Sequence, residues 1–192
     1  MTDFTDKEGL NKRVATSRTA WGGFRPDTIE PVGTGDESVW DYPRPPIIDD
    51  APAPVTVQMG DLVIARTNRA KRIKETASPP TIYIHPDDCD FRYLKEGSGL
   101  SVCEWKGKAQ YFDLQLPDGR RVGQVGWSYP DPFDNVIEGM ARLKDWLCFY
   151  PAKVECYVGD QRVRPQPGQF YGGWVTDTIK GPFKGEPGTG HW

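Results

Sequence analysis

The stretch QYFDLQLPDGRRVGQVGWS, residues 110–128, contains two runs of alternating side chains separated by a turn. Residues 110–116 alternate apolar and polar side chains with a period of two, which predicts a β-strand with one apolar face. Residues 117–119, Pro-Asp-Gly, have the composition of a tight turn, and residues 121–128 are predicted to return as the second strand. The stretch therefore predicts an antiparallel hairpin.

The rest of the central chain continues this pattern, with one exception. Residues 55–58 and 62–65 flank Met-Gly-Asp, where the glycine suits a tight hairpin turn. Residues 135–144 carry apolar side chains at helical spacing after Asp134, a suitable N-cap, and predict one short helix. Further strands are predicted at 81–84, 146–150 and 153–158. The predicted fold class is mainly β.

Length and composition predict one domain with extensions. The chain has 192 residues, with 21 glycines, 18 prolines and 12% aromatic residues, which is typical of a β domain whose core depends on large rings. Residues 1–54 show almost no periodic apolar pattern and are predicted to form an extended arm rich in Pro, Gly and aromatic residues. Residues 55–164 are predicted to form the domain, and residues 165–192 an irregular tail packed on it.

Charge and hydropathy argue against two classes of partner. Lys and Arg number 24 against 27 Asp and Glu, a net charge of −3, which does not favour a nucleic-acid-binding surface. No apolar run approaches the ~20 residues that cross a bilayer. The first residues are polar and acidic, unlike a secretory signal. We therefore expect a cytoplasmic protein.

Metal and cofactor motifs are scarce. The four cysteines, Cys89, Cys103, Cys148 and Cys156, include no C-x-x-C pair, and only two histidines are present, so neither a structural metal site nor a disulfide is predicted. Residues 87–90, Asp-Asp-Cys-Asp, have a D-x-D spacing that could hold a divalent metal, but a solvated turn is the favoured interpretation. Because no P-loop or G-x-G-x-x-G stretch is present, no cofactor is predicted.

The stretch CEWKG, residues 103–107, raises the possibility of a site. If it is extended, Cys103 and Trp105 share one face while Lys106 points to the other, and Gly107 permits a bend. Cys103 is then the best candidate for a reactive thiol, with Lys106 as a second catalytic candidate. Trp105, Tyr111, Trp127 and Tyr129 could line an aromatic pocket on one surface of the sheet, or could simply form the core.

Several pieces of the sequence together resemble the domain of unknown function 427 family. These pieces are residues 69–76, 79–86, 103–107, 109–111, 127–130 and 149–151, so the resemblance covers about residues 55–160. It implies a β-tent-like fold, a pair of small antiparallel sheets splayed from a shared apex. That fold is similar to the cereblon ligand-binding domain and to type B methionine sulfoxide reductase. The zinc of such relatives does not carry over, because the paired cysteines are missing.

Three functional hypotheses follow. The leading one is a small-molecule-binding module with an aromatic pocket. Its expected ligand-binding residues are Trp105, Lys106, Tyr111, Trp127, Tyr129, Tyr83, Arg69 and Glu75. The second is an enzyme, either thiol-dependent at Cys103 or nucleotidyltransferase-like, a label the resembling family has carried. The third is an interaction protein whose arms, with Trp21, Trp40, Trp174 and Trp192, cover the pocket or bind a protein partner or a second copy. The ligand is not identified by the sequence.

Overall fold

The computed structural model describes residues 15–16, 18–19, 22–168 and 170–192. Most of the first twenty-one residues, Trp21 included, therefore lie outside the described residues. The strands are β1 (Glu37–Ser38), β2 (Ile47–Asp50), β3 (Val55–Met59), β4 (Leu62–Thr67), β5 (Lys71–Glu75), β6 (Ser78–Tyr83), β7 (Leu94–Cys103), β8 (Gly107–Gln115), β9 (Arg121–Ser128), β10 (Cys148–Phe149), β11 (Glu155–Val158), β12 (Gln161–Arg162), β13 (Arg164–Pro165), β14 (Trp174–Val175) and β15 (Ile179–Lys180). Short 3₁₀ helices are η1 (Val39–Asp41), η2 (Pro86–Asp88) and η3 (Met140–Leu143).

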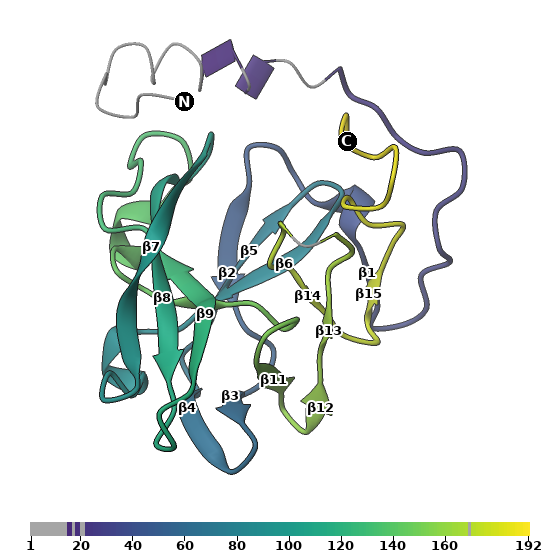
Figure 1. The fold of residues 1–192 in the computed structure, drawn as a ribbon. Coiled ribbons are helices and arrows are strands. Elements are labelled where there is room, and N and C mark those ends of the chain that lie inside the picture. Colours follow the sequence, from purple (N-terminus) through teal and green to yellow (C-terminus); the bar gives the residue numbers. More distant parts are fainter. Residues whose placement is uncertain (1–14, 17, 20–21, 169) are drawn as a thin grey trace.

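The strands form several small sheets. Two four-stranded antiparallel sheets have the orders β10-β9-β8-β7 and β12-β11-β3-β4, and a three-stranded antiparallel sheet has the order β2-β5-β6. Strand β13 pairs with β14, and β1 pairs in parallel with β15. Figure 1 shows β7–β9 on one side of the molecule, the C-terminal strands on the other, and β5 and β6 between them. The predicted mainly β fold of small antiparallel sheets is confirmed.

Both predicted hairpins are present. Strands β8 and β9 flank the turn at Gly119, and strands β3 and β4 pair Met59 with Leu62 around Gly60. Gly60 has φ 57° and Gly119 has φ 89°, which are left-handed conformations that favour glycine. Local alternation and turn composition were therefore sufficient to predict these elements.

The predicted helix over residues 135–144 is wrong. Only Met140–Leu143 is helical, as the 3₁₀ helix η3, and residues 134–137 are bends. Gly139 precedes η3 with φ 81° and offers no side chain to cap it, so the chain cannot continue an α-helix through this point. Ile137, Met140 and Leu143 are nevertheless buried. The apolar spacing therefore indicated which side chains are buried, but the chain reaches this arrangement without a helix.

Two parts of the structure were not anticipated. Strand β7, ten residues long, contains Gly97, Ser98 and Gly99 and shows no alternation, and it forms the edge of its sheet. Strand β2 pairs with β5 although residues 47–50 fall within the predicted extended arm. The domain limits at residues 54 and 164 stay predictions, but the N-terminal segment does contribute β1 and β2.

The C-terminal segment packs on the sheets. Trp174 of β14 is almost completely buried in the core cluster that includes Phe149, Ile82 and Leu147. Its indole Nε1 donates a hydrogen bond to the backbone oxygen of Phe149, at 3.0 Å. Later in the C-terminal segment, the backbone oxygen of Pro182 accepts a hydrogen bond from Trp40 Nε1, at 2.8 Å. No helix among the described residues is long and apolar enough to cross a membrane.

Replacing Trp174 with Phe tests whether the C-terminal segment is part of the cooperative fold. Phe keeps an aromatic side chain, although a smaller one, and the buried Phe149 oxygen loses its donor. We therefore expect the free energy of unfolding in urea to fall by about 1–3 kcal/mol. The control is Trp146→Phe, because Trp146 is only half-buried. Its ring packs edge-on against His85, with the two ring centroids 5.1 Å apart. Its expected loss is under about 1 kcal/mol. Equal losses of unfolding free energy in the two variants would contradict a role for the C-terminal segment in the cooperative fold.

Candidate functional site

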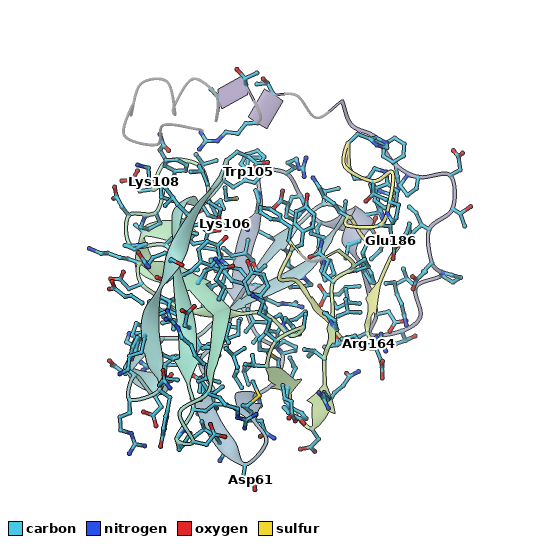
Figure 2. All side chains as sticks on the ribbon, in the orientation of Figure 1. Asp61, Trp105, Lys106, Lys108, Arg164 and Glu186 are labelled. Carbon is cyan, nitrogen blue, oxygen red and sulfur yellow. The ribbon has the colours of Figure 1, made fainter. Side chains whose placement is uncertain are left out.

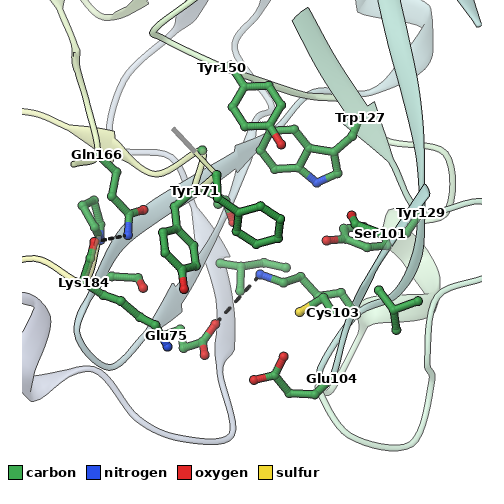
Figure 3. A pocket seen from close by; sticks show the side chains of 18 of the residues that line it. Glu75, Ser101, Cys103, Glu104, Trp127, Tyr129, Tyr150, Gln166, Tyr171 and Lys184 are labelled. Carbon is green, nitrogen blue, oxygen red and sulfur yellow. Dashed lines mark hydrogen bonds and ion pairs between the residues drawn. The ribbon is translucent and has the colours of Figure 1, made fainter. Parts of the chain in front are cut away.

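A cavity of about 200 Å³ lies where three parts of the chain meet. Strands β5 and β6 supply Ile73, Glu75, Ser78, Pro79 and Thr81. The sheet of β7, β8 and β9, with the turns next to it, supplies Ser101, Val102, Cys103, Glu104, Lys106, Tyr111, Trp127, Tyr129 and Tyr150. The C-terminal segment supplies Gln166, Phe170, Tyr171, Gly172 and Lys184. Figure 3 shows how these side chains surround the space.

Residues 104–106 form a turn between β7 and β8, which changes the predicted orientation of Lys106. The sequence pattern, taken as an extended strand, placed Lys106 on the face opposite Cys103. That expectation is wrong, because the turn directs Lys106 into the same cavity that Cys103 lines. Gly107 begins β8 with φ 112°, and a Cβ there would lie 3.0 Å from the backbone oxygen of Asp131. The bend therefore depends on glycine.

The carboxylate of Glu75 connects the turn to the rest of the molecule. Trp105 Nε1 donates to Glu75 Oε1 at 3.0 Å, and Arg44 Nη2 donates to the same oxygen at 3.0 Å. Lys106 Nζ lies 4.0 Å from Glu75 Oε2. Because the Glu75 side chain is only 17% exposed, these donors compensate a charge that would otherwise be costly to bury.

Trp105 therefore does not form the wall that the sequence predicted. It is buried, it is not among the residues that line the cavity, and its indole faces Glu75. Arg18 lies over the Trp105 ring as well. Its guanidinium carbon is 5.8 Å from the Trp105 ring centroid and 5.2 Å from the Phe133 ring centroid. Figure 2 shows Trp105 near the top of the domain, Lys106 below it, and Asp61, of the β3–β4 turn, at the bottom edge. We interpret Trp105 as a positioning residue.

Lys106 is a buried ammonium. Its side chain is 9% exposed. Burial by itself lowers the pKa of Lys106, but the acidic groups around it, Cys103 and Glu75 first among them, outweigh burial and raise the pKa above its ordinary value of 10.5. The direction of this shift favours the protonated amine. Within the described residues its Nζ makes no hydrogen bond, and its one ion pair is the 4.0 Å contact with Glu75.

Aromatic rings form the opposite wall of the cavity. The rings of Trp127 and Tyr150 pack with centroids 4.5 Å apart, and the Tyr111 hydroxyl lies 2.8 Å from Ser101 Oγ. The backbone at Gly172 rests directly on Trp127, since a Cβ at that position would lie 2.3 Å from Trp127 Cη2. The C-terminal segment therefore closes this side of the cavity at van der Waals distance.

Of the predicted ligand-binding residues, five line the cavity and three do not. Glu75, Lys106, Tyr111, Trp127 and Tyr129 are brought together there, as is the candidate thiol Cys103. Trp105 and Tyr83 are buried behind it in the core. Arg69 is far more exposed, and its Nε donates to Asp88 Oδ2 at 2.8 Å. Its role as a ligand anchor stays a prediction, and the structure places its guanidinium beside Asp88, outside this cavity.

The acidic stretch 87–90 also lies outside the cavity, and its side chains form ion pairs there. Asp88 accepts from Arg69 and from Thr67, and Asp90 pairs with Arg92 at 2.6 Å. These arginines lower the pKa of both carboxyls. Across the part of the chain that the structure describes, no group of three or more His, Cys, Asp or Glu side chains could hold a metal ion. The D-x-D spacing thus marks a surface turn with ion pairs.

Several lining residues were not predicted. Tyr150, Gln166, Tyr171 and Lys184 come from segments that the sequence pattern assigned to a strand end and to the tail. Gln166 is fixed on both sides, since its Nε2 donates to the Lys184 oxygen and its Oε1 accepts from Gly173 N. The stretch FYGGW, residues 170–174, was the available signal, because paired glycines beside aromatic residues suit a close backbone approach.

Cys103 tests the thiol-enzyme hypothesis. Burial raises the pKa of its thiol to about 11, although the Lys106 ammonium acts in the opposite direction. At neutral pH well under about 0.1% of the group is then thiolate, the reactive form. We expect iodoacetamide to leave Cys103 unmodified in the native protein, measured by mass spectrometry after proteolysis.

The control for this experiment is the same chain unfolded in urea, in which all four cysteines should react. Rapid modification of Cys103 in the native protein at neutral pH would restore it as a candidate nucleophile.

Comparison with models of protein families identifies the family of this chain. No curated protein matches the chain. The family model described as a domain of unknown function (DUF427) matches residues 47–160, which is more than half of the chain. The match extends from β2 to just beyond β11 and so contains Glu75, Cys103 and Lys106, but not the C-terminal residues of the cavity. The chain therefore belongs to the DUF427 family, as its sequence resemblance predicted.

Proposed function

We propose that this chain is a small-molecule-binding protein, and that Lys106 receives an anionic or strongly accepting group of the ligand. One observation carries the proposal. The Lys106 side chain is nine-tenths buried and lines a cavity, and its Nζ makes no hydrogen bond within the described residues. An ammonium has three donors, and burying it without acceptors is costly. A ligand oxygen in the cavity would supply the missing acceptor.

Glu75 does not supply the hydrogen-bond acceptor that Lys106 lacks. At 4.0 Å its Oε2 is beyond hydrogen-bond distance of Lys106 Nζ, so it stabilises the charge without saturating the donors. Its Oε1 already accepts from Trp105 and Arg44. The pair therefore holds a charged, oriented amine ready for a further partner.

A second polar atom points to the same use. Thr81 lines the cavity, and its Oγ1 is buried with no hydrogen-bond partner among the described residues. Buried hydroxyls are nearly always paired in native proteins. A ligand oxygen or nitrogen next to Thr81 would satisfy this hydroxyl.

The walls and the size of the cavity limit the ligand. Trp127, Tyr150 and Tyr171 line the cavity with aromatic rings, which suit a planar group. The volume of about 200 Å³ lies below the about 300–1,000 Å³ of pockets for drug-sized ligands. These features support a compact ring compound rather than a nucleoside triphosphate.

The enzyme alternatives have weaker support. The raised pKa of Lys106 keeps its amine protonated, so it is a poor nucleophile. The raised pKa of Cys103 argues in the same way against thiolate chemistry. Nucleotidyl transfer is not favoured either, because Asp88 and Asp90 pair with arginines away from the cavity.

Location and partners remain part of the proposal. All four cysteines are free, which supports a reducing compartment such as the cytoplasm. The arms are a less favoured interaction surface, since Trp40 and Trp174 are buried within the chain itself.

Replacing Lys106 with Met tests the proposed anchor. Met has a similar volume, and the Glu75 carboxylate keeps its donors Arg44 and Trp105 when the amine is removed, so it is not left without partners. A charge-assisted hydrogen bond contributes about 1.5–3 kcal/mol. We therefore expect the Kd for para-toluate, a small planar carboxylate, to rise at least about tenfold, measured by ligand-observed NMR titration.

Lys95→Met is the matched control, because Lys95 is exposed and donates to the Phe91 oxygen on the far part of β7. The control should bind para-toluate like the wild type. Unchanged binding in Lys106→Met, with the fold intact by circular dichroism, would contradict the proposed anchor.

A further inference from the structure

We propose that the ligand of this cavity is dipolar, and that Glu104 receives a cationic group at the other end of the molecule from the acceptor that meets Lys106. The inference rests on the proposed function and specifies its ligand class as a small planar zwitterion. It follows from which charges in the cavity already have partners and which do not.

Glu104 is the acid of the cavity that has no partner. It lines the cavity and is half-buried, and within the described residues its carboxylate makes neither a hydrogen bond nor an ion pair. Arg18 is close, but its Nε donates to the backbone oxygen of Glu104, at 2.6 Å. That bond fixes the turn without engaging the carboxylate.

Glu75 and Lys184, unlike Glu104, already have hydrogen-bond partners. Glu75 accepts from Arg44 and Trp105, and Lys106 is adjacent to it. Lys184 donates from Nζ to the backbone oxygen of Trp192. Neither lysine forms an ion pair with Glu104 among the described residues, so the carboxylate remains open to a cation brought by the ligand.

The surroundings of Glu104 suit a cation. Figure 3 shows the carboxylates of Glu75 and Glu104 on the side of the cavity away from Trp127 and Tyr150, with Tyr171 between. Burial raises the pKa of Tyr171, and the Glu104 and Glu75 carboxylates raise it further, which indicates that their field reaches into the cavity. An ammonium group already lies over this ring, since Lys184 Nζ is 5.7 Å from the Tyr171 centroid, and so this part of the cavity accommodates a cation.

The two ends therefore select for a ligand with both charges. An anion alone would contact Lys106 and leave Glu104 unpaired beside it, and a cation alone would leave the Lys106 donors unsatisfied. A flat zwitterion, with an amine and a carboxylate on one ring, would pair both while its ring packs on the aromatic wall.

A matched set of probes tests this inference on the full chain. The set is para-toluate, which carries only the anion, para-methylbenzylamine, which carries only the cation, and the para and meta isomers of (aminomethyl)benzoate, which carry both at two separations. We expect the better isomer to bind at least about tenfold more tightly than para-toluate. In Glu104→Gln that gain should disappear, while the Kd for para-toluate stays within about twofold of the wild type.

Glu96→Gln is the control, because Glu96 is an exposed acid on β7 outside the cavity. It should keep the gain. If wild type binds para-toluate but gains nothing from the amine, or if Glu104→Gln keeps the gain, the dipolar ligand is refuted while the anchor at Lys106 stands. If no probe binds wild type, both proposals fail together.

Discussion

The Glu75 carboxylate is the point on which the candidate site depends. It stands at the end of β5 and meets donors from two distant segments, Arg44 before β2 and Trp105 in the β7–β8 turn. Lys106 of the same turn lies next to its other oxygen. The cost of burying a carboxylate so little exposed is offset by these several donors. The same pairing holds the turn in the orientation that points Lys106 into the cavity.

The cavity is also a product of long-range packing. Its floor comes from β5 and the β7–β8 turn, and one wall comes from the C-terminal segment resting on Trp127 at Gly172. Trp174 anchors that segment in the core through Phe149. The C-terminal residues lie beyond the part of the chain that matches the DUF427 model, so the family domain supplies the charges and the extension closes the space around them.

Sequence patterns predicted the local parts of this structure well. The hairpins β3–β4 and β8–β9 followed from alternation and from glycine turns, which are properties of neighbouring residues. The helix over residues 135–144 failed because Gly139 takes a left-handed conformation inside an apolar spacing. Strand β7 was missed because its glycine- and serine-rich middle lacks alternation.

The site was predicted in part for the same reason. Residues of the sheet, such as Tyr111 and Trp127, could be placed on a common surface from their spacing. Because residues 104–106 form a turn, Lys106 lines the cavity and Trp105 does not, the reverse of the expected arrangement. No local pattern indicates that Tyr171 and Gln166 reach the same cavity. Those contacts depend on tertiary packing, since Gln166 and Tyr171 lie about 60–96 residues along the chain from Lys106 and Glu75.

The protonation state of Lys106 tests the central claim most directly. Nitrogen-detected NMR of the lysine side chains, titrated against pH in the wild type and in Glu75→Gln, would report it for the single amine. We predict that Lys106 stays protonated through neutral pH with a pKa above the ordinary 10.5, and that Glu75→Gln lowers that pKa. An amine that is neutral at pH 7, or a pKa that does not respond to Glu75, would contradict a charged anchor held by this carboxylate.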